Sequence, residues 1–186
     1  MILFVGLGNP TKEYENTRHN IGFMVIDYMI DYHKASLVSK TKFQGTLYKH
    51  NHNLFLKPST YMNLSGQSVA AVVNYYKVDE IVVVHDDIEI NLGSVRIKRS
   101  GSSGGHNGIK SIDSHVGNDY IRVRLGVGMP KNKEEIVNFV LGNFTKEESD
   151  CVQKIIHYSR EILDALTKDS LEDVIIKYTS KKGICG

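Results

Sequence analysis

The chain has 186 residues, of which 41% are hydrophobic and 24% are charged, and its formal net charge is +2. This length suits one domain, and the composition is normal for a soluble globular protein. The two cysteines, Cys151 and Cys185, form neither a CxxC pair nor a disulfide framework, which fits a reducing cytoplasm. Since no signal-peptide pattern and no stretch of about 18 apolar residues occurs, we expect neither secretion nor a membrane span.

The first half of the chain predicts alternating strands and helices. An apolar run that stops at a Gly-Leu-Gly-Asn-Pro turn indicates a buried strand over 2–7. Apolar residues at helical spacing predict a helix over 21–32. Two further runs predict a hairpin of strands 45–50 and 53–57, and an apolar stripe predicts a helix over 65–77.

The second half continues the alternation. A β-branched run predicts a strand over 80–84, which His85-Asp86-Asp87 follows. A Gly-rich loop, 100–108, leads into a predicted helix near 107–116. The remaining predicted elements are strands at 94–98 and 120–127, both with alternating basic residues, and helices at 145–166 and 171–178.

This order of elements predicts a single three-layer α/β domain, in which helices flank a twisted sheet. Because a hairpin cannot be parallel, the sheet should be mixed. The sequence shows no internal repeat and no domain linker, and residues 129–133 are the best candidate for a mobile loop.

The residues that follow the predicted strands indicate hydrolytic chemistry. Such segments contain Asn9, His19, Asn63 and Asp86, whereas Asn107 precedes a predicted helix. Loops of this kind converge at one edge of an open α/β sheet. No serine or cysteine nucleophile is obviously paired with a base. A histidine could therefore activate water, a carboxylate could orient it, and asparagine amides could stabilise an oxyanion.

A local excess of positive charge indicates a phosphate-binding patch. Against only Asp113 and Asp119, the segment 94–124 contains a run of basic residues: Arg96, Lys98, Arg99, Lys110, Arg122 and Arg124. Side chains two residues apart on a strand share one face, so the two basic strands can present cations together. The alternative is a solvated strand face.

Two motifs suggest other enzyme classes. Gly6-Leu7-Gly8 resembles a dinucleotide fingerprint, but the third glycine is missing and Pro10 blocks smooth entry into a helix. Residues 101–105 fit GxSxG, but a basic segment precedes them and the acid and histidine that follow share one helix. A flexible Gly/Ser loop explains the second motif better.

Three further residue sets have a structural and a functional interpretation. His50 and His52 share a strand face and could bind a metal, although a solvated hairpin explains them better. His85 could be catalytic or a structural hydrogen-bonding residue. Asn107 could cap the helix that follows it, which is compatible with a catalytic role.

Several blocks, in order along almost the whole chain, resemble those of bacterial peptidyl-tRNA hydrolases. They are residues 5–10 (Val-Gly-Leu-Gly-Asn-Pro) with Tyr14 and 17–20 (Thr-Arg-His-Asn), 58–66 (Pro-Ser-Thr-Tyr-Met-Asn-Leu-Ser-Gly), 85–87 (His-Asp-Asp), 104–108 (Gly-Gly-His-Asn-Gly) and 139–142 (Phe-Val-Leu-Gly). The resemblance implies a usually monomeric cytoplasmic enzyme that cuts the ester between peptide and tRNA. No cofactor and no metal are expected.

The resemblance also implies roles for individual residues. His19 corresponds to the catalytic histidine, and Asp86 to the acid that pairs with it. Asn9, Asn63 and Asn107 correspond to asparagines that position substrate or water. The residues that correspond to substrate-binding neighbours in the cleft are Tyr14, Tyr61, Met62, Gly105 and His106.

For the tRNA, the resemblance implies recognition of the acceptor stem and CCA end. Lys98 and Arg124 correspond to residues that clamp a phosphate, and Arg96 stands where relatives carry lysine, which keeps the charge but changes its geometry. Residues 131–142 correspond to a mobile lid. Two rival functions remain, a non-catalytic RNA-binding relative and a small-ester hydrolase.

Overall fold

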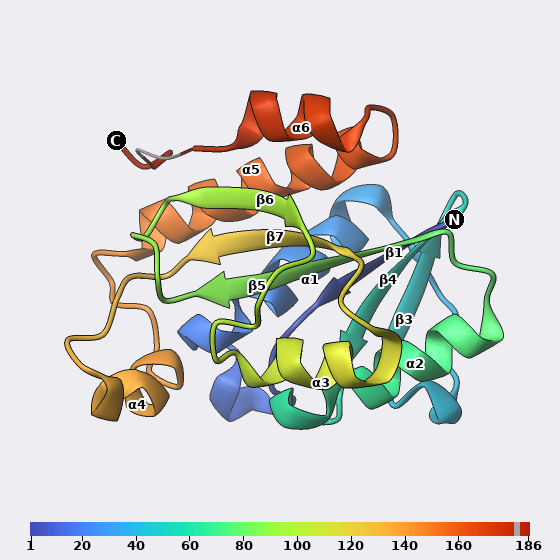
Figure 1. The fold of residues 1–186 in the computed structure, drawn as a ribbon, viewed down its shortest axis with the longest axis horizontal. Helices are drawn as coiled ribbons and strands as arrows, with labels where there is room; N and C mark the ends of the chain where they lie inside the picture. Colours follow the sequence, from blue (N-terminus) through green and yellow to red (C-terminus); the bar gives the residue numbers. More distant parts are fainter. Residues whose placement is uncertain (181–182) are drawn as a thin grey trace.

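Seven strands form one twisted sheet in the computed structural model, which describes residues 1–180 and 183–186 (Figure 1). Their order across the sheet is β2-β3-β4-β1-β5-β7-β6. The strands are β1 (Ile2–Gly6), β2 (Ser36–Leu37), β3 (Gly45–His50), β4 (Asn53–Pro58), β5 (Glu80–Asp87), β6 (Val95–Arg99) and β7 (Ile121–Gly126). Strands β4, β1, β5 and β7 are parallel, whereas β2, β3 and β6 pair in antiparallel fashion, which confirms the predicted mixed sheet.

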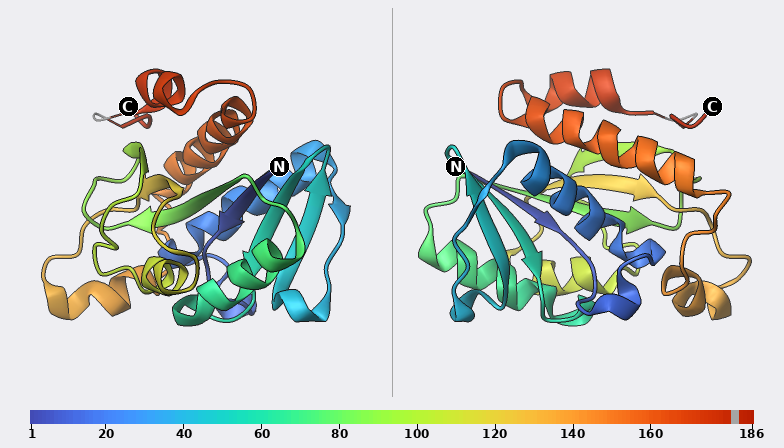
Figure 2. Two further views of the ribbon diagram at one scale, coloured as in Figure 1. Left: turned by 45° about the vertical axis from the view of Figure 1, so that its right-hand side comes forward. Right: turned by 180° about the vertical axis from the view of Figure 1, so that it is seen from behind.

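Helices cover both faces of this sheet. They are α1 (Ile21–His33), α2 (Ser65–Tyr75), α3 (Asn107–Val116), α4 (Ile136–Val140), α5 (Ser149–Leu166) and α6 (Leu171–Tyr178). Helices α2 and α3 pack on one face, while α1 and α5 lie side by side on the other, as Figure 2 shows from behind. No helix in the described residues combines the length and apolar composition that crossing a bilayer requires.

Strand β1 and residues 81–84 of β5 are apolar because each face of the sheet is buried under helices there. Phe4 and Val82 belong to the core on the α1/α5 side, while Leu3, Val5 and Val83 belong to the core on the α2/α3 side. Successive side chains of a strand point to opposite faces, so alternate residues supply the two cores. This explains the continuous apolar runs in the sequence and confirms the three-layer α/β fold.

Several elements differ from their predicted limits: α5 begins at Ser149 instead of residue 145, and α2 ends at Tyr75 instead of residue 77. Strand β5 continues to Asp87, because His85, Asp86 and Asp87 pair with Arg124, Leu125 and Gly126 of β7. The predicted end of this strand at residue 84 was therefore wrong. The predicted lid region 131–142 contains a 3₁₀ turn (Lys133–Glu135) and the short helix α4.

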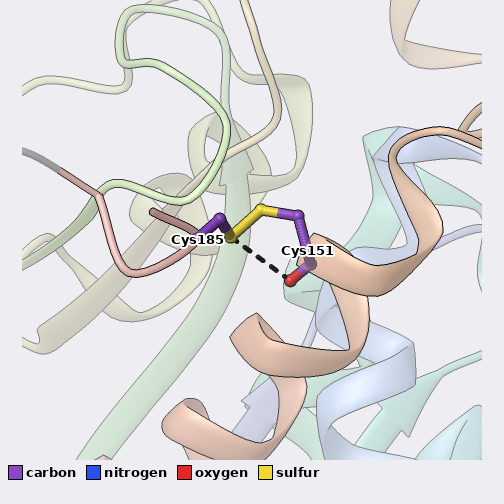
Figure 3. Close-up of a disulfide and its surroundings, with 2 residues drawn as sticks. All are labelled: Cys151 and Cys185. Atoms are coloured by element: carbon purple, nitrogen blue, oxygen red, sulfur yellow. Dashed lines mark hydrogen bonds between the residues drawn. A yellow bond between two sulfur atoms is a disulfide. The ribbon is translucent and has the colours of Figure 1, made fainter.

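The C-terminal tail is fastened to the body of the protein by a disulfide. Cys151 at the start of α5 is bonded to Cys185, with their Cα atoms 5.3 Å apart (Figure 3). Ser180 exchanges two backbone hydrogen bonds with Val95 of β6, and the Ile184 amide donates to the Gly93 carbonyl. A side chain at residue 93 would meet both sulfurs. The interpretation of the cysteines as unpaired was wrong, because the tail returns to the start of α5.

Reducing this disulfide should destabilise the fold. The bond joins residues 34 apart in sequence, and closing a loop of this size contributes up to about 4 kcal/mol by restricting the unfolded chain. Thermal unfolding of the oxidised protein should therefore shift downward by several degrees on addition of a thiol reductant. The Cys151→Ser/Cys185→Ser variant is the control and should be insensitive to reductant. A reductant-insensitive wild-type transition would contradict the assignment.

Candidate active site

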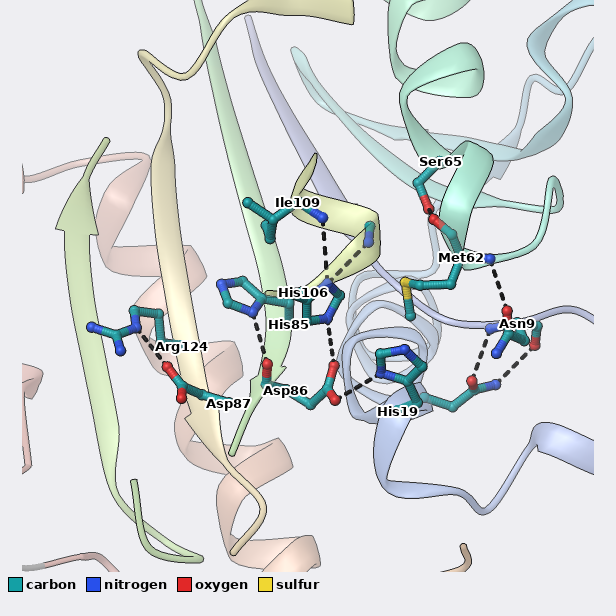
Figure 4. A network of polar contacts seen from close by, with 12 residues as sticks. Asn9, His19, Met62, Ser65, His85, Asp86, Asp87, His106, Ile109 and Arg124 are labelled. Atoms are coloured by element: carbon teal, nitrogen blue, oxygen red, sulfur yellow. Dashed lines mark hydrogen bonds and ion pairs between the residues drawn. The ribbon is translucent and has the colours of Figure 1, made fainter. Parts of the chain in front are cut away.

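A cavity of about 640 Å³ lies at the carboxyl ends of the parallel strands, where open α/β sheets usually form their sites. Segments that follow β1 and β4 meet the end of β5 and the start of α3 at this edge (Figure 4). The predicted site residues that line the cavity are Asn9, His19, Tyr61, Met62, Asn63, Asp86, Lys98, Gly105, His106, Asn107 and Arg124.

The Asp86 carboxylate is the centre of the polar network. One oxygen lies 2.7 Å from His19 Nδ1, and the other lies 2.8 Å from His106 Nε2. Asp86 is only 2% exposed, so its two oxygens depend on these imidazoles rather than on bulk water. His19 comes from a 3₁₀ turn (Arg18–Asn20) before α1, and His106 precedes α3.

The contacts of His106 Nδ1 show which ring nitrogen carries the proton. Its Nδ1 accepts hydrogen bonds from the backbone amides of Gly108, at 3.1 Å, and Ile109, at 3.3 Å. His106 is thus the N-cap of α3, and Asn107 is the first residue of the helix, so the predicted capping role of Asn107 was wrong. Because Nδ1 accepts, the ring proton lies on Nε2 and is donated to Asp86.

The charges of this network shift two pKa values. Burial by itself favours the neutral form of Asp86, but the electrostatic interactions and hydrogen bonds with His19 and His106 outweigh it, so the Asp86 pKa lies well below its usual range. Burial likewise disfavours a charged His19. The Asp86 charge and hydrogen bond together exceed that effect and raise the His19 pKa above 6.5.

Asn9 is held so that its NH₂ group is the part left for a ligand. Its side-chain oxygen accepts from the Met62 amide at 2.8 Å. Its backbone N–H and C=O both bond to the Asn20 side chain, at 2.8 and 2.9 Å. Tyr61, next to Met62, has φ 65°, a conformation that non-glycine residues rarely adopt and that this contact helps to maintain.

Tyr14 lies outside the cavity lining. Its ring contacts Tyr61 edge-on, with centroids 6.4 Å apart, so it supports a residue that lines the cavity. Asn63 and Asn107 line the cavity from the segment after β4 and from the start of α3. The structure therefore places the predicted asparagines around the Asp86 network. Tyr14 is separated from the cavity by Tyr61.

The basic strands extend the cavity away from the histidines. Arg96 pairs with Arg124 and Lys98 with Arg122 across β6 and β7, which confirms that these residues share one face. Lys98, Arg122 and Arg124 line the cavity, whereas Arg96 does not. Arg124 donates to Asp87 at 2.7 Å. Lys98 forms no ion pair with the described residues, which leaves it available to an anion.

Two arginines have roles that the sequence did not predict: Arg122 was expected only in the phosphate-binding patch, and Arg18 had no expected role of its own. Arg122 is 2% exposed and donates to the Ser102 carbonyl at 2.6 Å, so it supports the Gly/Ser loop rather than facing solvent. Arg18 donates to the carbonyls of Phe139 and Asn143, at 3.3 and 3.0 Å, and its guanidinium lies over the Phe139 ring. The turn that carries His19 is thus attached to residues 139–143, which overlap the predicted lid. Only the charge of Arg18 beside His19 could have indicated such a role.

The same residues offer ligand atoms for a cation. One atom each from His19, Asp86 and His106 lies within 4.8 Å of the others. The two histidine–aspartate distances, 2.7 and 2.8 Å, are those of hydrogen bonds. Ligands around a tetrahedral zinc ion at about 2.0 Å would lie about 3.3 Å apart. The geometry therefore favours protons between these groups.

Comparisons with known proteins point to one family. The family model described as peptidyl-tRNA hydrolase matches residues 3–184. The chain is 51% identical over 184 residues to the peptidyl-tRNA hydrolase of Campylobacter curvus, covering 99% of each chain, and 48% identical over 180 residues to that of Sulfurimonas denitrificans, covering 97% of each. A crystal structure of peptidyl-tRNA hydrolase from Acinetobacter baumannii is similar, with 34% identity, a TM-score of 0.92, and coverage of 98% of this chain and 96% of that one.

The Asp86→Asn variant should lower the His19 pKa. The carboxylate raises this pKa above 6.5, whereas burial, which the substitution keeps, lowers it. We therefore expect the His19 midpoint to move below 6.5 in an NMR titration of the imidazole C–H protons. Asp173→Asn, an exposed carboxylate in α6, is the control and should not move it. An unchanged midpoint in Asp86→Asn would show that the carboxylate does not govern His19.

Proposed function

We propose a residue-level mechanism for this chain, which belongs to the peptidyl-tRNA hydrolase family and hydrolyses the ester between peptide and tRNA. The observation that carries the proposal is the 2.7 Å contact between His19 Nδ1 and buried Asp86. Because Asp86 is ionised, it holds the His19 proton on Nδ1. The unprotonated Nε2 is then available as a general base.

The reaction begins when water attacks the ester carbonyl carbon and transfers a proton to His19 Nε2. The carbonyl oxygen becomes an oxyanion, and the carbon is tetrahedral. When this intermediate collapses, the bond to the ribose oxygen breaks, and the His19 imidazolium returns its proton to that oxygen. Asp86 stabilises the imidazolium throughout. Since neutral His19 is the active base, kcat/KM should fall as the pH decreases through the raised His19 pKa.

The asparagines supply donors around the reacting ester. The Asn9 NH₂ group would hold a peptide carbonyl, because its oxygen is already used by Met62. Asn63 and the segment of Gly105 and Asn107 line the same cavity and would serve the oxyanion and the attacking water. A free α-amino cation placed against amide donors would be left unpaired, which favours an N-blocked peptide.

The basic face would hold the tRNA. Lys98 and Arg124 would bind a phosphate of the acceptor stem, and the CCA end would lead from there to His19. Arg96 lies outside the cavity, and its charge would add to the positive electrostatic potential over this face. Such contacts bind the sugar-phosphate backbone and not the bases, so they suit an enzyme that accepts tRNA as a class. We further propose that the protein acts as a monomer in the cytoplasm, with residues 131–142 as the lid.

The structure does not favour the non-catalytic alternative, because a water-activating pair is assembled in the cavity. A small-ester hydrolase would use the same pair but would not need the basic face. Salt dependence on a tRNA substrate therefore distinguishes the two.

The His19→Ala variant should lose about 10³-fold or more in kcat on N-acetyl-aminoacyl-tRNA, because it lacks the general base. Binding of the tRNA should stay nearly unchanged, since the cations that hold it are untouched. Release of tRNA and filter binding measure the two properties. The His52→Ala variant, in the exposed hairpin turn, is the control. Near-normal turnover of His19→Ala would remove this residue from the mechanism.

The Lys98→Ala variant should raise KM for the tRNA substrate and lower the slope of log affinity against log salt by about one unit. Lys98 is the suitable cation to test, because removing Arg124 would also leave Asp87 without its 2.7 Å partner. The exposed Lys168 gives a matched control in Lys168→Ala. An unchanged slope for Lys98→Ala would favour the small-ester function.

A further inference from the structure

His85 is a buried imidazole in the site that the mechanism above does not use. It is 5% exposed and lies in β5, directly before Asp86. Its Nδ1 is 2.8 Å from the Asp86 carbonyl oxygen, and its ring packs edge-on against His106 with centroids 5.0 Å apart (Figure 4). His85 thus contacts both the backbone of Asp86 and one of the two rings that bind the Asp86 carboxylate.

The hydrogen bonds fix which nitrogen of His85 carries the proton. A carbonyl oxygen only accepts, so Nδ1 must donate to Asp86 and must be protonated. Nε2 is buried and has no partner among the described residues, so it remains a lone pair. Burial, and after it the neighbouring His106, lowers the His85 pKa to about 3, so the ring stays neutral at physiological pH. A neutral His85 ring can donate a hydrogen bond to the Asp86 backbone carbonyl without forming a second ion pair with the Asp86 carboxylate.

His85 cannot take part in proton transfer as His19 does. One nitrogen is engaged by a backbone carbonyl, and the other is covered by protein. What the ring can do is fix the orientation of the peptide group that follows Asp86, together with the position of the His106 ring. Both determine where the carboxylate oxygens lie relative to His19, at the end of a strand where the ladder is about to stop.

We propose that His85 is a positioning residue for the hydrolytic site: its Nδ1–H holds the Asp86 backbone and its ring supports His106, so that the carboxylate meets both imidazoles. The proposal rests on the mechanism given above and adds a residue to it. It predicts that the Nδ1 donor of His85 matters for turnover, whereas the Nε2 lone pair does not.

Three substitutions at this position separate these features. In His85→Asn the side-chain NH₂ occupies nearly the place of Nδ1, so the donor to Asp86 is kept. In His85→Gln the amide reaches the Nε2 position instead, and in His85→Leu the donor is lost while apolar bulk is kept. Ser159→Ala, which removes a buried 2.7 Å hydrogen bond within α5, controls for a loss of stability remote from the site.

We would measure the turnover of N-acetyl-aminoacyl-tRNA, the pH profile of kcat/KM and the NMR titration of His19. Urea unfolding of every variant reports its stability. We expect kcat of His85→Leu and His85→Gln to fall about 10- to 100-fold, as for a misplaced catalytic group, with KM nearly unchanged. The His19 midpoint should move to lower pH in both, because Asp86 is held less well. His85→Asn should recover kcat to within about threefold of wild type, and Ser159→Ala should keep wild-type kcat.

The proposal is overturned if His85→Leu turns over normally, or if all three variants lose kcat equally while the His19 titration is unchanged. Recovery by His85→Gln rather than His85→Asn would also overturn it, because it would place the function at Nε2. These outcomes differ from failure of the mechanism itself, which would appear as normal turnover of His19→Ala.

Discussion

The site depends on one buried charge, the carboxylate of Asp86, and on the two imidazoles that share it. A buried carboxylate without partners is strongly disfavoured, so its position is stable only where donors are fixed in advance. His106 is fixed because amides in the first turn of α3 bind its other nitrogen. His19 is fixed by a turn that Arg18 attaches to the Phe139 and Asn143 carbonyls. A strand end, a helix start and a turn therefore meet at one functional group.

This arrangement accounts for the division of labour among the three histidines. They differ in what binds the second nitrogen of each ring. In His106 it is occupied by backbone amides, in His85 it is buried without a partner, and in His19 it has no hydrogen bond with the described residues. The chemistry of one residue type is thus set by its contacts. The basic face on β6 and β7 follows similar logic, since Arg122 and Arg124 are held by protein groups and Lys98 forms no ion pair in the described chain.

Sequence patterns predicted those parts of the fold in which one local rule dominates. Strand β1 and helix α1 have clear apolar periodicity, and the strand-end rule placed Asn9, Asn63 and Asp86 at one edge. Sequence patterns failed where residues far apart in the chain decide the structure. Strand β5 continues through polar residues because β7 pairs with it. His106 caps α3 because its ring can turn back to the helix amides. No local sequence pattern could predict the disulfide, because Cys185 lies 34 residues from Cys151 and meets α5 only through the path of the C-terminal tail. The roles of Arg18 and Arg122 likewise depend on contacts far apart in sequence.

The docked tail has a consequence for the solution behaviour of the protein. Strand β6 is the last in the sheet, and Ser180 covers part of its free side through two backbone hydrogen bonds with Val95. An uncovered sheet edge is a template for strand addition by another molecule. The Cys151–Cys185 link keeps that cover in place, so it acts against self-association as well as unfolding. Reduction of the disulfide would therefore weaken the cover on this edge of the sheet.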